Sequence, residues 1–216
     1  MAILVFGCFA GAYFLSYALR SVNAVIAPPL TQAFGLSNAQ LGSLSSAYFF
    51  AFALMQLPLG IWLDRYGSRR VNACLLLVAA AGCAVFASAS GVTTLWVGRA
   101  LIGVGVSGAL MSALKGYRFW YSATRLQQLT AWMLVAGTAG ALTVTVPVQL
   151  VLPVVGWRGV FWGVAVLLVL VAATLWALVP RDEERHAAAV HAPAPAPAQE
   201  SRPAPAGVGA VPADGA

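Results

Sequence analysis

Two arginines stand alone in long uncharged stretches of this sequence. Arg20 is the only charged residue between positions 1 and 63, and Arg99 is the only one between 71 and 114. A guanidinium donates paired hydrogen bonds to a carboxylate, so the two side chains together could bind a small organic anion. Two alternatives stay open. Each arginine could extend its charged end to the edge of an apolar layer, and Arg99 could instead hold neighbouring helices through their backbone carbonyls.

Aromatic and amide side chains accompany Arg20 on one face of a predicted helix. Tyr13, Tyr17 and Arg20 recur at spacings of four and three residues, which places them on the same helix face, and Asn23 lies beside them. We therefore predict a binding site for a small-molecule substrate that consists of Tyr13, Tyr17, Arg20, Asn23 and Arg99. Weaker candidates are polar side chains in the other apolar stretches, namely Tyr48, Gln56, Thr143 and Gln149.

A short charged segment joins two apolar stretches at residues 60–70. Asp64 lies where a helix is expected to end, and an acid is unfavourable beside the negative end of the helix dipole. We therefore expect Asp64 to have a partner, either a basic side chain or the N-terminus of another helix. Gly67 is predicted to permit a tight turn, and Gly60 is predicted to let a neighbouring helix approach closely. The two arginines that end the segment suit an anionic lipid surface.

Membrane helices must position these residues, because the composition excludes a water-soluble globule. Of the 216 residues, 61% are hydrophobic and 8% are charged, whereas soluble domains carry about 25% charged residues. Uncharged runs of about 20 residues match the thickness of the hydrocarbon layer, where the backbone must be helical. We predict an all-α membrane protein in contact with the lipid bilayer. Its six transmembrane helices are expected at about 3–26, 39–63, 71–90, 93–115, 128–152 and 158–179, with Pro28 and Pro29 ending the first.

The basic residues set the expected orientation. Eight of them fall on one side of the predicted helices: Arg65, Arg69, Arg70, Lys115, Arg118, Arg125, Arg181 and Arg185. The positive-inside rule assigns that side to the cytoplasm, so both termini are expected there, in a multi-pass protein of the bacterial cell (inner) membrane. Arg20 and Arg99 then lie at equal depth, roughly 9 Å below the outer surface. Because the net charge of +6 follows from topology, no nucleic acid partner is expected.

The composition divides the chain into two domains. Residues 1–185 form the predicted transmembrane domain, and residues 186–216 are a Pro/Ala-rich segment that cannot build a packed core. We expect this tail to be disordered and cytoplasmic, with His186 and His191 solvated in it. No metal site is expected. The match of residues 103–108 to G-x-G-x-x-G follows no strand and lies in an apolar helix, so no dinucleotide or other cofactor is expected either.

The charged segment resembles a cytoplasmic loop of the major facilitator superfamily of secondary transporters. The pattern of that loop, G-x-x-x-D-R/K-x-G-x-R/K-R/K, is matched at each defined position by Gly60, Asp64, Arg65, Gly67, Arg69 and Arg70. Arg99 followed by Gly103 and Gly108 resembles a motif of the family's fourth helix. The resemblance implies an N-terminal bundle of two inverted three-helix repeats, transport by alternating access, substrate contacts on the first and fourth helices, and a charge network in the loop that locks or releases the inward gate.

Residues 103–108 admit an enzymatic interpretation that we disfavour. Gly105, Ser107 and Gly108 match the G-x-S-G pattern that supplies the serine nucleophile of six-span rhomboid proteases. That chemistry needs a base nearby, and both histidines fall in the tail. Close helix packing by Gly103, Gly105 and Gly108 is the preferred interpretation, and the chain is expected not to be an enzyme.

Family members have twelve helices in two halves, so this chain corresponds to the N-terminal six-helix half. We expect it to be truncated or to need a second half, which a second copy in a homodimer could supply; an inactive fragment is the remaining alternative. None of the predicted spans carries an acid in its interior, since Asp64 lies at a helix end. Proton coupling would therefore rely on the other half, unless the mechanism is anion exchange or facilitated movement. The substrate, the coupling ion and the direction of transport are not specified by the sequence.

Overall fold

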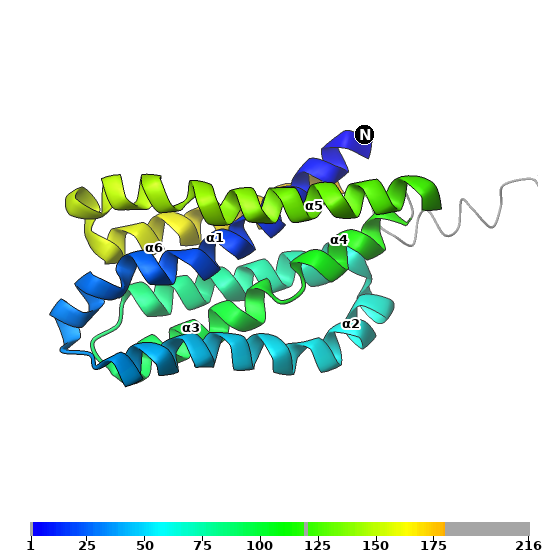
Figure 1. Cartoon of the computed structure of the whole chain (residues 1–216). Helices are drawn as coiled ribbons and strands as arrows, with labels where there is room; N and C mark the ends of the chain where they lie inside the picture. The colour runs from blue at the N-terminus through cyan, green and yellow to red at the C-terminus, as the bar shows by residue number, and fades with distance from the viewer. Residues whose placement is uncertain (1, 119–120, 180–216) are drawn as a thin grey trace, which may run out of the picture.

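Every element of the computed structural model, which describes residues 2–118 and 121–179, is an α-helix (Figure 1). The elements are α1 (Ala2–Phe34), α2 (Asn38–Ala87), α3 (Val92–Val106), α4 (Ala109–Tyr117), α5 (Ala123–Thr143) and α6 (Thr145–Leu178). Four helical stretches of this part are long and apolar enough to cross a membrane: Ile3–Phe34, Asn38–Ala87, Val92–Tyr117 and Thr124–Leu178. The predicted all-α membrane class is thus confirmed. The predicted tail, with both histidines, lies outside the described residues.

Two of these stretches reverse direction at a glycine. Gly67 within α2 has φ 78° and ψ 161°, and Gly156 within α6 has φ 69° and ψ 170°. Glycine adopts such left-handed backbone angles without the steric penalty of a Cβ atom. In Figure 1 the chain folds back within α2 at one end of the bundle, whereas α6 folds back at the opposite end, beside the α1–α2 and α2–α3 connections. The pieces of α2 before and after Gly67, residues 38–66 and 68–87, therefore run antiparallel.

The end of the first helix differs from the prediction at Pro28 and Pro29. The helix α1 continues through both prolines to Phe34, because a membrane helix tolerates the lost backbone hydrogen bonds when neighbouring groups compensate. It ends instead at Gly35, which has φ 63°. After Gly35 the chain needs only two further residues before α2, where Ser37 caps the new helix in a capping box with Gln40.

The interior of the bundle is apolar and tightly packed, and its exterior is also apolar. Packing is most extensive between α2 and α3, followed by α2 with α6 and α1 with α5. Large side chains such as Phe9, Phe86 and Phe161 are fully buried, whereas Leu57 and Val154 are exposed on the outside. An exterior covered by exposed leucine, valine and aromatic side chains is what a lipid-facing surface requires.

Glycines of α3 and α4 bring these helices directly onto α2. A Cβ atom on Gly103 would collide with the backbone carbonyl of Tyr48, and one on Gly105 would collide with the backbone of Ala79. On Gly108, a Cβ atom would overlap the side chain of Leu75. The expected close approach at Gly60 is wrong for the described part of the chain, because nothing there lies within 4 Å of a Cβ built on Gly60. Gly60 faces outward, away from α3.

Candidate functional site

Arg20 is surrounded by four aromatic rings, which are called the aromatic nest below. Its guanidinium carbon is 4.9 Å from the ring centroid of Tyr17 on α1, and 5.9, 5.5 and 5.5 Å from those of Tyr48, Phe49 and Phe52 on α2. Aromatic faces attract a cation without neutralising it. The Nε atom of Arg20 is buried and has no hydrogen-bond partner among the described residues. The sequence analysis missed the α2 side of this nest, apart from Tyr48 as a weak candidate.

The two predicted tyrosines form a pair next to Arg20. The hydroxyl of Tyr13 donates to that of Tyr17 over 3.2 Å, and the ring centroids are 4.9 Å apart. Gly137 of α5 lies against both rings, and a Cβ atom there would be 2.7 Å from Tyr13. Tyr13 is buried against α5, whereas Tyr17 is partly exposed and contacts Arg20. Of the two, Tyr17 therefore lies closer to the guanidinium.

Arg99 occupies the core of the bundle and is only 1% exposed. It donates a hydrogen bond of 2.5 Å to Oδ1 of Asn23, whose Nδ2 in turn donates to Oγ of Ser45 over 2.7 Å. Its guanidinium carbon lies 4.8 Å from the ring centroid of Phe86 and 5.5 Å from that of Phe161. The structure thus brings Arg99 and Asn23 together and links α3 to α1, α2 and α6. Arg20 and Arg99 stack over different aromatic rings, but Tyr48 lies close enough to interact electrostatically with both.

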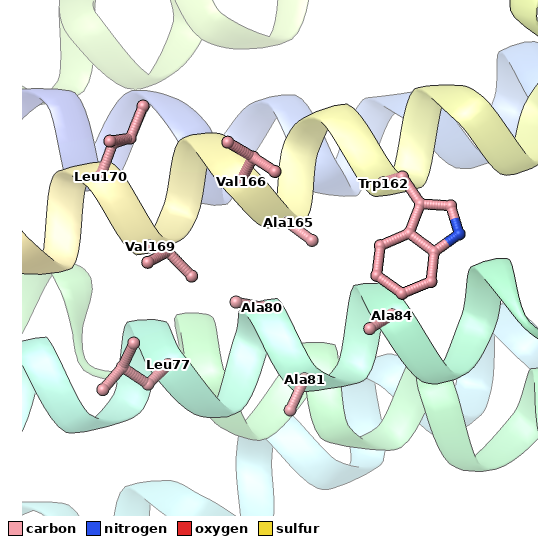
Figure 2. A pocket seen from close by; sticks show the side chains of 9 residues that line it. All are labelled: Leu77, Ala80, Ala81, Ala84, Trp162, Ala165, Val166, Val169 and Leu170. Atoms are coloured by element: carbon pink, nitrogen blue, oxygen red, sulfur yellow. The ribbon is translucent and has the colours of Figure 1, made fainter.

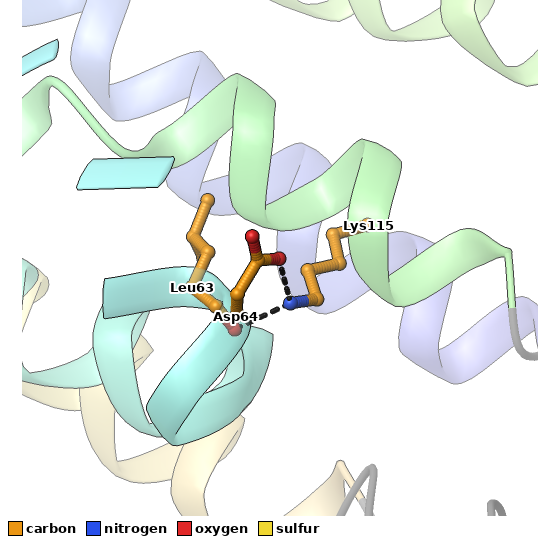
Figure 3. Close-up of polar contacts among 3 residues, drawn as sticks. All are labelled: Leu63, Asp64 and Lys115. Carbon is orange, nitrogen blue, oxygen red and sulfur yellow. Dashed lines mark hydrogen bonds and ion pairs between the residues drawn. The ribbon is translucent and has the colours of Figure 1, made fainter. Parts of the chain in front are cut away.

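The charge balance of the described part is uneven. Asp64 is the only acidic residue between positions 2 and 179, and Nζ of Lys115 lies 2.7 Å from its Oδ1 (Figure 3). Lys115 also donates to the backbone carbonyl of Leu63 over 2.5 Å. No carboxylate of the described residues is therefore left to neutralise Arg20 or Arg99. The N–H donors of such a guanidinium are able to form charge-assisted hydrogen bonds with an anion that reaches them.

The other residues of the 60–70 segment have individual partners. Arg69 donates to the carbonyl oxygen of Trp176 and stacks over its ring at 5.2 Å, which ties the Gly67 turn to the end of α6. Arg65 stacks over Tyr66 at 5.5 Å, and Arg70 is half-buried. The sequence predicted a basic side chain as one possible partner of Asp64 but did not identify it as Lys115, and it did not predict the contact of Arg69 with Trp176. A lone lysine in a chain whose other basic residues are arginines was the one signal available for Lys115.

Polar residues at the junction of α3 and α4 serve packing. Ser107 is buried and its Oγ donates to the carbonyl of Val104 over 2.6 Å. Nε2 of Gln56 donates to the carbonyl of Ser107 over 3.3 Å and joins α2 to this junction. The described residues include no histidine that could act as a base for Ser107. Thr143 donates to the carbonyl of its own helix at Ala139 and does not contact Arg20.

Comparisons with known proteins agree with this arrangement. The family model described as Major Facilitator Superfamily matches residues 9–210. The chain is 31% identical over 162 residues, 73% of its length, to the probable sulfoacetate transporter SauU of Cupriavidus necator, of which this covers 37%. It is 34% identical over 93 residues, 43% of its length, to the nitrate/nitrite transporter NrtP of Picosynechococcus sp., covering 17% of that protein.

A third relative is the probable L-galactonate transporter of Escherichia coli, at 27% identity over 174 residues, which are 79% of this chain and 37% of that protein. The chain thus spans little more than a third of the length of these curated relatives. The family match covers most of the chain, and the resemblance carried by residues 60–70 is confirmed. This chain belongs to the major facilitator superfamily.

Proposed function

We propose that this chain is the N-terminal six-helix half of a secondary transporter that moves a small anion across the membrane by alternating access. The single observation that carries the proposal is Arg20, a guanidinium held among four aromatic rings with no ion-pair partner among the described residues. Sulfoacetate, nitrate and L-galactonate, which appear in the names of its relatives, are all anions. The proposed substrate class is therefore a small carboxylate, sulfonate or oxyanion.

The five predicted site residues divide into two roles in this proposal. Arg20 contacts the anion, because this residue is only partly buried, and Tyr17 beside it offers a hydroxyl. Tyr13 holds Tyr17 through their hydroxyl contact. Asn23 and Arg99 act mainly as positioning residues, since their hydrogen bonds fix α1 against α2 and α3 one turn away from Arg20.

The reversals at Gly67 and Gly156 support six membrane crossings. They would divide the four apolar stretches into six spans, arranged as two inverted three-helix repeats. The Gly67 end carries most of the basic residues, so we assign it and both termini to the cytoplasmic side of an inner membrane. The basic residues on that side are Arg65, Arg69, Arg70, Lys115, Arg118 and Arg125, with Arg181 and Arg185 beyond the described part.

The ion pair between Asp64 and Lys115 is the proposed cytoplasmic lock. It joins the end of the second span to the end of the fourth at 2.7 Å. Closing this side while Arg20 is reached from the other would give one of the two states that alternating access needs. The matched region covers 37% of the length of two of the relatives. We propose that a second six-helix half, or a second copy of this chain, completes the substrate path.

The test is uptake of labelled sulfoacetate, nitrate and L-galactonate by the intact carrier in proteoliposomes. Arg20→Ala is expected to reduce uptake of the preferred anion about 100-fold, since charge-assisted hydrogen bonds contribute roughly 1.5–3 kcal/mol each. Arg20→Lys should retain part of the activity. The matched control is Arg118→Ala, which removes an equal charge from an exposed position at the end of α4. Unchanged uptake by Arg20→Ala would overturn the proposal.

A further inference from the structure

Two apolar grooves of similar size lie on different sides of α2. Each encloses about 400 Å³. The first lies between residues 68–87 of α2 and the part of α6 after Gly156 (Figure 2). The second lies between residues 38–66 of α2 and α3. Each groove has one tryptophan in its lining, Trp162 in the first and Trp96 in the second. The pair therefore allows a comparison within one molecule.

Small side chains of α2 and a large one of α6 shape the first groove. Figure 2 shows the ring of Trp162 projecting from α6 toward Ala84 of α2, while Val166 and Val169 continue along the α6 wall. The Trp162 side chain is 50% exposed. In a membrane protein such an open apolar channel suits a hydrocarbon chain, because apart from the indole N–H of Trp162 the lining side chains are aliphatic.

A cation stands at one end of this groove. Arg158 precedes Trp162 by four residues and thus lies on the same face of α6. It donates a hydrogen bond of 2.7 Å to the carbonyl of Ala89, just beyond the α2 wall, and stacks over Trp157 at 4.6 Å. Its side chain is exposed, and it has no carboxylate partner among the described residues. The fork of N–H donors on a guanidinium leaves several free for a phosphate.

We propose that the first groove binds a glycerophospholipid from the leaflet on the Gly156 side of the membrane. The phosphate is held by Arg158, one acyl chain lies along Val166 and Val169, and the glycerol ester region lies beside Trp162. Tryptophan favours this boundary between headgroup and hydrocarbon. The charge of Arg158 complements the phosphate, and Arg158 lies one helical turn before Trp162, the first α6 residue of the groove's lining. This site is independent of the proposed transport of anions.

The second groove lacks the headgroup contact. The arginine nearest to it on α3, Arg99, is 1% exposed and turned toward Asn23 in the core. A lipid chain there would have apolar contacts alone. The first groove should therefore retain a lipid more strongly than the second, although their volumes are similar. The difference measures how much Arg158 adds to lipid binding.

Native mass spectrometry of the delipidated intact carrier, titrated with phosphatidylglycerol, tests the site. The wild type should retain one phospholipid about tenfold more tightly than Arg158→Gln, the loss expected for one charge-assisted contact. Ala84→Leu should block the first groove, whereas Ala51→Leu in the second should leave retention unchanged. Arg158→Lys keeps the charge and should retain the lipid at intermediate strength. Equal retention by all variants would overturn the proposal, as would displacement of the lipid by inorganic phosphate.

A photoactivatable phospholipid provides a measurement that does not depend on the Arg158 variant folding. The probe carries a diazirine in its acyl chain and is mixed into vesicles of phosphatidylethanolamine and phosphatidylglycerol. Adducts on residues 77–84 and 162–170 should exceed those on 47–58 and 96–104 several-fold, and Ala84→Leu should reduce them. Equal labelling of both grooves would show an ordinary lipid boundary and would overturn the proposed site.

Discussion

The charges near the Gly67 turn are neutralised within the chain, whereas the arginines among the apolar helices have no acidic partner among the described residues. Near the turn, Asp64 and Lys115 pair with each other, and their side chains are 83% and 24% exposed. Among the apolar helices, Arg20 and Arg99 have aromatic rings and amide oxygens for neighbours and no acid. A charge of the second kind is costly to keep within a membrane. The first region has its ion pair within the chain, whereas in the proposed function Arg20 of the second region takes its partner from the transported anion.

An acidic side chain placed beside Arg20 should have the largest effect, because it would give the guanidinium an ion-pair partner within the chain. Phe49 lies in the aromatic nest and is 50% exposed, so Phe49→Glu can place a carboxylate beside the guanidinium. We expect the apparent affinity for the transported anion to fall about 100-fold, because the substrate must displace an internal charge-assisted pair. Competition of unlabelled against labelled anion in proteoliposomes measures this affinity. Phe49→Gln is the control for size, and equal losses in both variants would contradict the interpretation.

Replacing Arg99 by methionine should separate the effect of its charge on uptake from the effect of its packing on stability. A buried charge exchanged for an apolar side chain of similar volume often leaves stability unchanged. We expect the free energy of unfolding of Arg99→Met to change by less than about 1 kcal/mol, while uptake falls about tenfold because Asn23 loses its partner. Thermal unfolding in detergent and uptake from the same preparation give the two values. A large loss of stability would instead identify Arg99 as a structural tie between helices.

Removing the acid of the exposed pair should have a smaller effect. Asp64→Asn leaves Lys115 without its carboxylate but keeps its hydrogen bond to the Leu63 carbonyl. Because exposed ion pairs contribute at most about 1 kcal/mol, we expect uptake to change about two- to fivefold. The exchanged pair Asp64→Lys with Lys115→Asp should recover part of the difference. If uptake by Asp64→Asn equalled that of the wild type, the ion pair between Asp64 and Lys115 would not contribute to transport.

The sequence predicted those parts of the site that follow from local spacing. The face shared by Tyr13, Tyr17 and Arg20 and the turn at Gly67 depend on helix periodicity and on one backbone angle, so neighbouring residues specify them. Lys115 as the partner of Asp64 is 51 residues away, and it depends on how α4 lies against α2.

The same limit applies to the aromatic nest and to the prolines. Phe49 and Phe52 meet Arg20 only because α2 packs beside α1 at that level. The continuation of α1 through Pro28 and Pro29 depends on surrounding groups that satisfy its backbone. Such contacts between distant segments follow from packing, which a single sequence read by local pattern does not specify.

The smallest expected effects concern Gly60 and Gly67, the two glycines that flank Asp64 of the proposed cytoplasmic lock. Gly67 has φ 78°, so Gly67→Ala should destabilise the turn by about 1 kcal/mol, the cost of a left-handed backbone for a residue with a Cβ atom. Gly60 is helical and has open space around its Cβ position, so Gly60→Ala should leave stability unchanged or raise it by up to about 1 kcal/mol. Thermal unfolding of the two variants, with uptake measured in parallel, checks both signs. If Gly60→Ala were the more harmful of the two, another helix would have to cover Gly60 in the complete carrier. The position of the Asp64–Lys115 ion pair would then depend on contacts with the second half.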